Sequence, residues 1–108
     1  MIVTGDLGAV GLEMLQELAR LDGLSLGGRL ADCGTMVFDS ARQDVHAGGS
    51  GCGCSAAVLN GHLIPGLLAG RWRRILFCPT GALLSPTSTQ QGLPIPAVCH
   101  AVSICSGR

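Results

Sequence analysis

The chain has 108 residues and a formal net charge of zero; 47% of its residues are hydrophobic and only 13% are charged. The length allows one domain at most, and the neutral charge does not favour nucleic acid as a partner. Because soluble domains average about 25% charged residues, we expect part of this surface to be covered by something else.

The first predicted element is the end of a β-strand at residues 1–4, where Ile-Val-Thr is followed at once by the turn residues Gly-Asp. A buried strand usually has about five or six residues, so we expect further sequence upstream of Met1. An amphipathic helix is predicted over Leu12 to Leu21, ending near Asp22-Gly23. The residues expected on its buried face are Leu12, Leu15, Leu18 and Ala19, with Glu17 and Arg20 paired in solvent.

The middle of the chain predicts a second strand and a second helix. Thr35 to Phe38 reads as a short buried strand, and residues 39–50 form a loop rich in glycine and polar residues. Small residues from Gly51 onward, followed by Val58, Leu59, Leu63, Leu67 and Leu68, predict a helix packed closely against a neighbour. Pro65 predicts a kink or an early end of that helix.

The last third of the chain predicts two strands separated by a long polar loop. Arg74 to Cys78 is the clearest strand and stops at Pro79, residues 83–96 form the loop, and Ala97 to Ile104 is the final strand. The resulting order β, α, β, α, β, β predicts an α/β fold: a mixed sheet with packed helices, ending in an antiparallel strand pair. A loop of this length is often functional.

The cysteines and the lengths of the apolar runs indicate the cellular compartment that we expect for this chain. No secretory signal follows Met1, and several of the six cysteines lie inside apolar runs, where a reduced thiol packs as a small hydrophobe. We therefore expect reduced thiols in a cytosol-like compartment. No uninterrupted apolar stretch approaches the ~20 residues of a membrane helix, so we expect no transmembrane segment.

The segment from His46 to Ser55 is the most specific candidate functional motif in the sequence, and three interpretations of it stay open. A metal site from His46, Cys52 and Cys54 is incomplete, because structural zinc usually takes four ligands, and no metal is expected. A nucleophilic cysteine at a helix N-terminus, with His46 as base, is the second interpretation. In the third, the small residues only let the helix approach the sheet, while the N–H groups of Gly48 to Gly51 offer donors to an anion.

The charges are divided along the chain. All seven acidic residues lie between Asp6 and Asp44, and the later half carries only arginines. The cluster Arg71-Trp72-Arg73-Arg74 fits either an anionic partner or a solvated turn, and a cluster this small favours the turn. His62 and His100 lie on apolar segments and are expected to be packed. Asp44 either orients His46 or caps a turn.

Three of these segments resemble the stage V sporulation protein AD family. They are Ile-Val-Thr-Gly-Asp-Leu-Gly at residues 2–8, Asp-Val-His-Ala-Gly-Gly-Ser-Gly-Cys-Gly-Cys-Ser-Ala at 44–56, and the long run from Arg74 to Gly92. Asp32-Cys33-Gly34 also fits, and the resemblance covers nearly the whole chain. It implies a thiolase-like fold of two similar halves, with residues 1–108 as the C-terminal half-domain. It also implies that the N-terminal half is absent, including the region where thiolase-like enzymes carry their reactive cysteine.

The resemblance further implies a sporulation accessory protein that binds dipicolinic acid for uptake into the spore and release at germination. The implied partners are membrane proteins of the same operon, with the chain peripheral at the spore inner membrane, and its own missing N-terminal half. We expect no enzymatic activity and no cofactor; the alternatives are a thiolase-type acyl-transfer enzyme and a structural subunit docking on membrane partners. The residues expected at the ligand, beside a contribution from loop 83–92, are His46, Gly48, Gly49, Ser50, Gly51 and Cys52.

Overall fold

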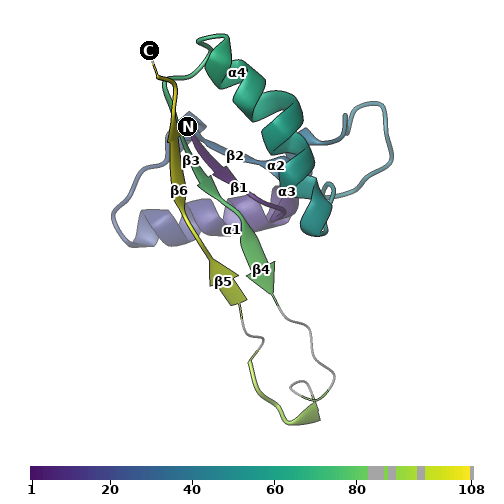
Figure 1. The fold of residues 1–108 in the computed structure, drawn as a ribbon. Helices are drawn as coiled ribbons and strands as arrows, with labels where there is room; N and C mark the ends of the chain where they lie inside the picture. The colour runs from purple at the N-terminus through teal and green to yellow at the C-terminus, as the bar shows by residue number, and fades with distance from the viewer. Residues whose placement is uncertain (83–86, 88–89, 95–96, 108) are drawn as a thin grey trace.

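A computed structural model describes residues 1–82, 87, 90–94 and 97–107. Its centre is a four-stranded sheet in the order β2-β1-β3-β6 (Figure 1). The strands β1 (Ile2–Thr4), β2 (Leu30–Asp32) and β3 (Arg74–Cys78) are parallel, and β6 (Val102–Cys105) runs antiparallel to β3. The mixed sheet and its antiparallel end confirm the predicted α/β class; the thiolase-like half-fold stays a prediction.

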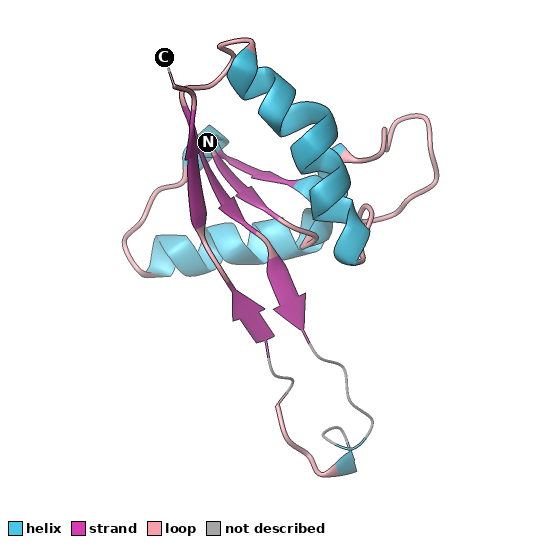
Figure 2. Ribbon diagram, in the orientation of Figure 1, coloured by secondary structure: helices cyan, strands magenta, loops and turns pink. Residues whose placement is uncertain are grey.

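Helices cover the two faces of the sheet (Figure 2). Helix α1 (Gly8–Leu21) crosses one face, and a continuous helical segment covers the other. That segment consists of α3 (Cys52–Val58), a π-helical turn η2 (Leu59–Leu63) and α4 (Ile64–Leu68). The path from β1 to β2 therefore uses one face, and the path from β2 to β3 uses the other. The carboxyl ends of β1 and β3 form a topological switch point, where open α/β sheets bind their ligands.

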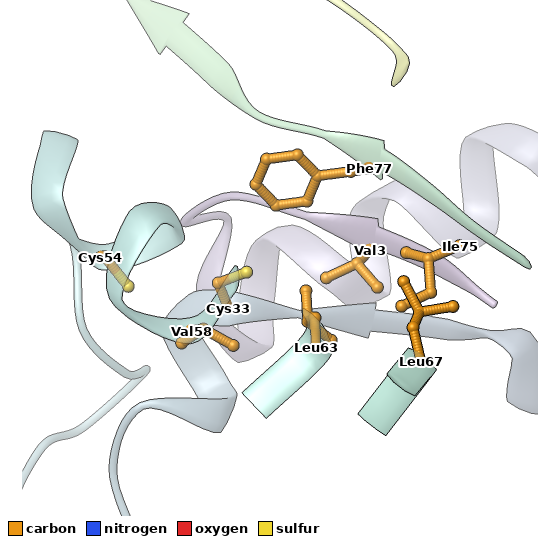
Figure 3. Close-up of a cluster of buried hydrophobic side chains, with 8 residues drawn as sticks. All are labelled: Val3, Cys33, Cys54, Val58, Leu63, Leu67, Ile75 and Phe77. Atoms are coloured by element: carbon orange, nitrogen blue, oxygen red, sulfur yellow. The ribbon is translucent and has the colours of Figure 1, made fainter. Parts of the chain in front are cut away.

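The hydrophobic core lies between the sheet and α3–α4. Val3, Ile75 and Phe77 point from the strands toward Leu63 and Leu67 (Figure 3). All of these side chains are buried, as are Val58, Cys33 and Cys54 in the same cluster. The predicted close packing of the second helix is confirmed. Helix α1 adds no residue to this cluster.

The predicted strand Thr35–Phe38 is wrong. The strand falls five residues earlier, on β2, which follows a 3₁₀ turn at Gly27–Arg29. After β2 the chain enters a short helix, α2 (Cys33–Met36). The cause is Asp32, whose side chain accepts the backbone N–H of Thr35 at 3.2 Å and caps the helix. Short apolar runs do not distinguish strand from helix, and here the capping residue decided it.

Two further expectations need correction. Leu18, expected on the buried face of α1, is 60% exposed, whereas Ala19 is buried and Leu12 and Leu15 are half-buried. In the last turns of α1 the buried residue is Ala19, whereas Leu18 faces solvent. Pro65 does not end its helix, which runs on to Leu68; the predicted irregularity is the π turn just before it.

The predicted final strand is divided in two. β5 (Ala97–Cys99) pairs with β4 (Thr80–Ala82), while β6 pairs with β3, and both pairs are antiparallel. Strand β4 was not predicted, because Pro79 was read as an end; instead the hairpin continues past it. Pro79 has no N–H to give to the ladder, so it separates the two sheets. The predicted loop lies largely at residues 83–86, 88–89 and 95–96, outside the described residues.

Candidate functional site at the carboxyl ends of the strands

A buried carboxylate organises the turns beneath the site. The Asp32 side chain is fully buried, and its Oδ1 accepts the Thr4 hydroxyl at 2.7 Å and the Leu7 N–H at 2.9 Å. Its Oδ2 accepts the N–H groups of Gly8 at 3.0 Å and Thr35 at 3.2 Å. One side chain thus joins the start of α1 to the start of α2.

The glycine-rich loop packs backbone against backbone on this base. The Ala9 N–H donates to the Ala47 carbonyl at 2.8 Å, and the Gly49 N–H donates to the Gly34 carbonyl at 2.6 Å. A Cβ atom at Gly34 would lie 2.5 Å from the Gly49 oxygen, and Gly48 has φ of 124°. Both positions therefore require glycine. Close packing accounts for much of the motif, as the third interpretation of the sequence expected.

Most of the backbone N–H groups expected to bind an anion are used within the chain. The Gly48 N–H donates to the Val45 carbonyl at 2.9 Å, and Gly49 is bonded to Gly34. The Gly51 N–H, which precedes α3, donates to Asp6 Oδ2 at 3.3 Å. Among the described residues no such partner is found for the Ser50 N–H. The loop backbone is thus satisfied largely by the protein itself, and a carboxylate of the chain stands where a ligand carboxylate was expected.

Asp6 also connects the loop to the hairpin. Its Oδ1 accepts the Thr80 hydroxyl at 3.2 Å, so β1, α3 and β4 meet at one carboxylate. Beside it opens a groove of about 660 Å³, whose lining residues come from the turn after β1 and from the β4–β5 hairpin. They are Asp6, Leu7, Thr80, Gly81, Ala97, Val98 and Cys99. Asp6 and Thr80 were not predicted as site residues; both follow parallel strands closely, and this was the signal that could have identified them.

Among the predicted ligand residues, the Gly51 N–H bonds to Asp6 of this groove, but none of those that the structure describes in full is a lining residue. The His46 side chain is 90% exposed, on a backbone with φ of 49°, and its Nε2 lies 3.8 Å from Asp44 Oδ1. Asp44 is 92% exposed as well, so this contact is weakened by solvent. Ser50 is exposed; Cys52 begins α3, and its side chain lies outside the described part of the structure.

The buried thiols are poor nucleophiles. Burial, with smaller contributions from the neighbouring Cys54 and Asp32, raises the pKa of Cys33 to about 11. The pKa of Cys54 is also raised, first by burial and then by Asp32 and Asp6. Both thiols therefore stay protonated near neutrality. Within the described residues, no three His, Cys, Asp or Glu side chains come together to hold a metal ion.

The arginine cluster lies at the far end of the helical segment, as expected. Gly66 lets α4 approach the Trp72 ring closely, since a Cβ atom at this position would collide with the ring. Arg71 stacks 5.5 Å from the centroid of Trp72, and His62 meets the same ring edge-on at 5.6 Å. His62 contacts this ring but is exposed, and His100 is exposed too, so the expectation that both histidines are packed is wrong. Arg71, Trp72 and Arg73 lie between α4 and β3, and Arg74 begins β3.

Comparison with known proteins gives the relatives of this chain. The family of stage V sporulation protein AD matches residues 1–105. The chain is 42% identical over 102 residues to stage V sporulation protein AD of Bacillus subtilis (strain 168). The match covers 94% of this chain and 30% of that relative. No helix among the described residues is long and apolar enough to cross a membrane.

Proposed function

Because this chain belongs to the stage V sporulation protein AD family, we propose that it forms part of a site for dipicolinic acid in a sporulation protein. The matched relative is more than three times longer than the shared segment, which covers 30% of it. The proposed site lies between this segment and a preceding N-terminal part. The proposed task is binding during uptake of dipicolinic acid into the spore and its release at germination.

The exposed side of α3–α4 is the observation that carries this proposal. No charged residue occurs between Asp44 and Arg71, yet much of the helical segment is exposed. Leu68 is 70% exposed, and the other exposed residues described for this segment are Gly53, Ala56, Ala57, Asn60, Gly61, His62 and Pro65. A helix with no charged side chain is normally covered on all sides. We propose that the N-terminal part of the protein covers it.

The loop before α3 would then border the boundary between the two parts. Because its backbone donors are largely engaged by Val45, Gly34 and Asp6, side chains must recognise the ligand. The exposed His46 imidazole and Ser50 hydroxyl are the donors available there. Gly48, Gly49 and Gly51 shape the loop, and Cys52 begins the helix. Dipicolinate carries two carboxylates, and Asp6 cannot pair with either, so the second set of donors would come from the N-terminal part.

Binding is better supported than acyl transfer. A thiolase-type reaction needs a thiolate beside a base, but the pKa of Cys54 is raised and His46 points into solvent. These features favour a protein that binds without reacting.

The test is calorimetry with dipicolinate on two proteins: this chain alone, and a chimera in which it replaces the matching segment of the Bacillus subtilis relative. We expect weak or no binding by the chain alone and binding by the chimera. In the chimera, His46→Ala and Ser50→Ala should each weaken binding several-fold, whereas Ser40→Ala, in an exposed part of the same long loop, should not. Tight binding by the chain alone would show that the site does not lie between two parts. Unchanged binding by both loop variants would remove the loop from the site.

A second role, docking on membrane proteins of the same operon with the chain peripheral at the spore inner membrane, is favoured by α1. Four apolar side chains lie exposed along this helix: Val10, Met14, Leu18 and Leu21, each at least 60% exposed. They are on the opposite face of the sheet from α3–α4. Leu18→Glu in the chimera should reduce co-purification with those membrane proteins while leaving dipicolinate binding unchanged. Intact co-purification would argue against this surface.

A further inference from the structure

The four-stranded and the two-stranded sheet are parts of one hairpin, whose ladder is interrupted between Phe77 and Thr80 on one strand and between Cys99 and Val102 on the other. We call this interruption the joint. Phe77 pairs with Val102 and Thr80 pairs with Cys99, so the same register continues across the gap. Pro79, which has no N–H, falls opposite His100 in this register. The backbone on both sides of the gap is therefore not held by ladder bonds of either sheet.

Two cysteines lie on either side of this joint. Cys78 ends β3 and Cys99 ends β5, and in the common register they are diagonal neighbours on one face of the hairpin. Burial, and after it the neighbouring Cys99, raises the pKa of the Cys78 thiol. Cys78 is half-buried, whereas Cys99 is exposed and lines the groove beside Asp6. Both are free thiols in the structure.

We propose that Cys78 and Cys99 form a redox-modification site that reacts with low-molecular-weight disulfides and closes to an internal disulfide across this joint. The exposed Cys99 reacts first. Its thiolate attacks one sulfur of the small disulfide, which forms a mixed disulfide at Cys99 and releases one small thiol. The Cys78 thiolate then attacks the Cys99 sulfur and releases the second small thiol. The dithiol is oxidised by two electrons, and the small disulfide is reduced to two thiols.

The gap in the ladder makes this closure feasible. Diagonal neighbours in an antiparallel pair lie about 7–8 Å apart, and a disulfide needs Cα atoms within about 7 Å, so the strands must move slightly together. Because Pro79 and His100 make no ladder bonds there, that movement breaks none. The bridge would fix the β4–β5 hairpin relative to the main sheet. Since Cys99 and Thr80 line the groove, closure would also change the wall opposite Asp6.

A second pair of thiols in the core provides a contrast. Cys33 and Cys54 are neighbours in the core cluster, but both are buried. A small disulfide cannot reach them while the protein is folded. Cys105 on β6 is exposed but has no cysteine partner among the described residues that the structure places beside it. Accessibility together with a neighbouring thiol therefore distinguishes Cys78–Cys99.

The experiment is to incubate the folded chain with oxidised glutathione, alkylate the remaining thiols under denaturing conditions, and measure the intact mass. We expect the loss of two hydrogens, with two of the six cysteines protected from alkylation. Cleavage with chymotrypsin, which cuts after Leu84, should leave the Cys78 and Cys99 peptides joined. The variant Cys78→Ser should accumulate glutathione on Cys99, whereas Cys105→Ser should form the internal bridge as the unchanged chain does.

Two results would overturn the proposal. One is glutathione on both Cys78 and Cys99 of the unchanged chain, with no internal bridge. The other is an internal bridge that maps to a different pair or persists in Cys99→Ser. Because the peptide mapping uses the unchanged chain, the outcome does not depend on whether a variant folds.

Discussion

Substitution of Asp32 tests the turns on which the site rests. Asn has nearly the same shape as Asp but carries one acceptor oxygen and one NH₂ group. If the Asn oxygen keeps the bonds from Gly8 and Thr35, its NH₂ group faces the Leu7 N–H and the Thr4 hydroxyl. The hydroxyl can rotate to accept, but the Leu7 donor is left without a partner.

The magnitude follows from those bonds. Each hydrogen bond to a charged group is worth about 1.5–3 kcal/mol, and an orphaned buried donor costs about 1–3 kcal/mol. Asp32→Asn should therefore destabilise the chain by about 3 kcal/mol. Asp32→Ala removes the acceptor for all four donors and should cost at least ~4 kcal/mol, a large part of the 5–15 kcal/mol typical of a domain. Asp39→Asn is the matched control, because Asp39 is exposed and its side chain accepts only one local N–H, that of Ala41 at 3.1 Å.

The assay is urea unfolding followed by circular dichroism, at protein concentrations below self-association. With slopes of about 1–3 kcal/mol per molar, Asp32→Asn should lower the midpoint by roughly 1–3 M, and Asp39→Asn should leave it nearly unchanged. Hydrogen exchange should show faster exchange of the Leu7 and Gly8 amides in Asp32→Asn. If its midpoint equals that of the control, or if these two amides stay fully protected, Asp32 does not hold the turns together.

The remaining predictions concern packing, pH and association. Gly66→Ala should destabilise the chain by about 1–3 kcal/mol, because the new methyl group meets the Trp72 ring, whereas Gly61→Ala, in open space, should be neutral or stabilising by up to about 1 kcal/mol; equal thermal midpoints would contradict this. The pKa of the Cys33 thiol is raised from 9.0 to about 11, so its contribution is present below about pH 9 and is lost as the pH rises toward 11. This loss is roughly 3 kcal/mol, and Cys33→Ala should abolish that part of the alkaline destabilisation seen in unfolding measured from pH 8 to 11. Finally, the exposed apolar side chains of α1 and of α3–α4 should make the isolated chain self-associate, and a monodisperse monomer in sedimentation with a sharp cooperative melt would refute this.

Local signals in the sequence located the elements whose formation depends on neighbouring residues. The apolar run after Arg74, ended by Pro79, predicted β3, and the periodicity of leucines predicted α1, although its start was set at Leu12 instead of Gly8. The small residues from Gly51 onward and the leucines after them predicted a helix packed against a neighbour, and the strands of the sheet are that neighbour. These signals are readable because side chains two to four residues apart share a face in a strand or a helix.

The candidate site was predictable only in part. The motif at residues 46–51 was identified, and its glycines do shape a loop at the start of α3. The use of their N–H groups was not predictable, because the acceptors for Gly49 and Gly51 lie on Gly34 and Asp6. The carboxylate of Asp6 accepts from a residue 45 positions away and from another 74 positions away. Spacing within the motif carries no information about partners at such separations.

The sequence by itself determined the family, the α/β class and most of the elements, since these depend on motifs and on short-range periodicity. Only the tertiary structure decided which groups those elements bring together. Asp32 is a buried acceptor for the N–H groups of Leu7 and Gly8 because β1 and β2 lie side by side. The same side chain caps the N-terminus of α2, so that a helix forms where a strand was predicted. Cys78 and Cys99 became neighbours because a hairpin folds their strands together. Hydrogen bonds and thiol contacts act over a few ångströms in space, and the fold sets those distances, whatever the separation along the chain.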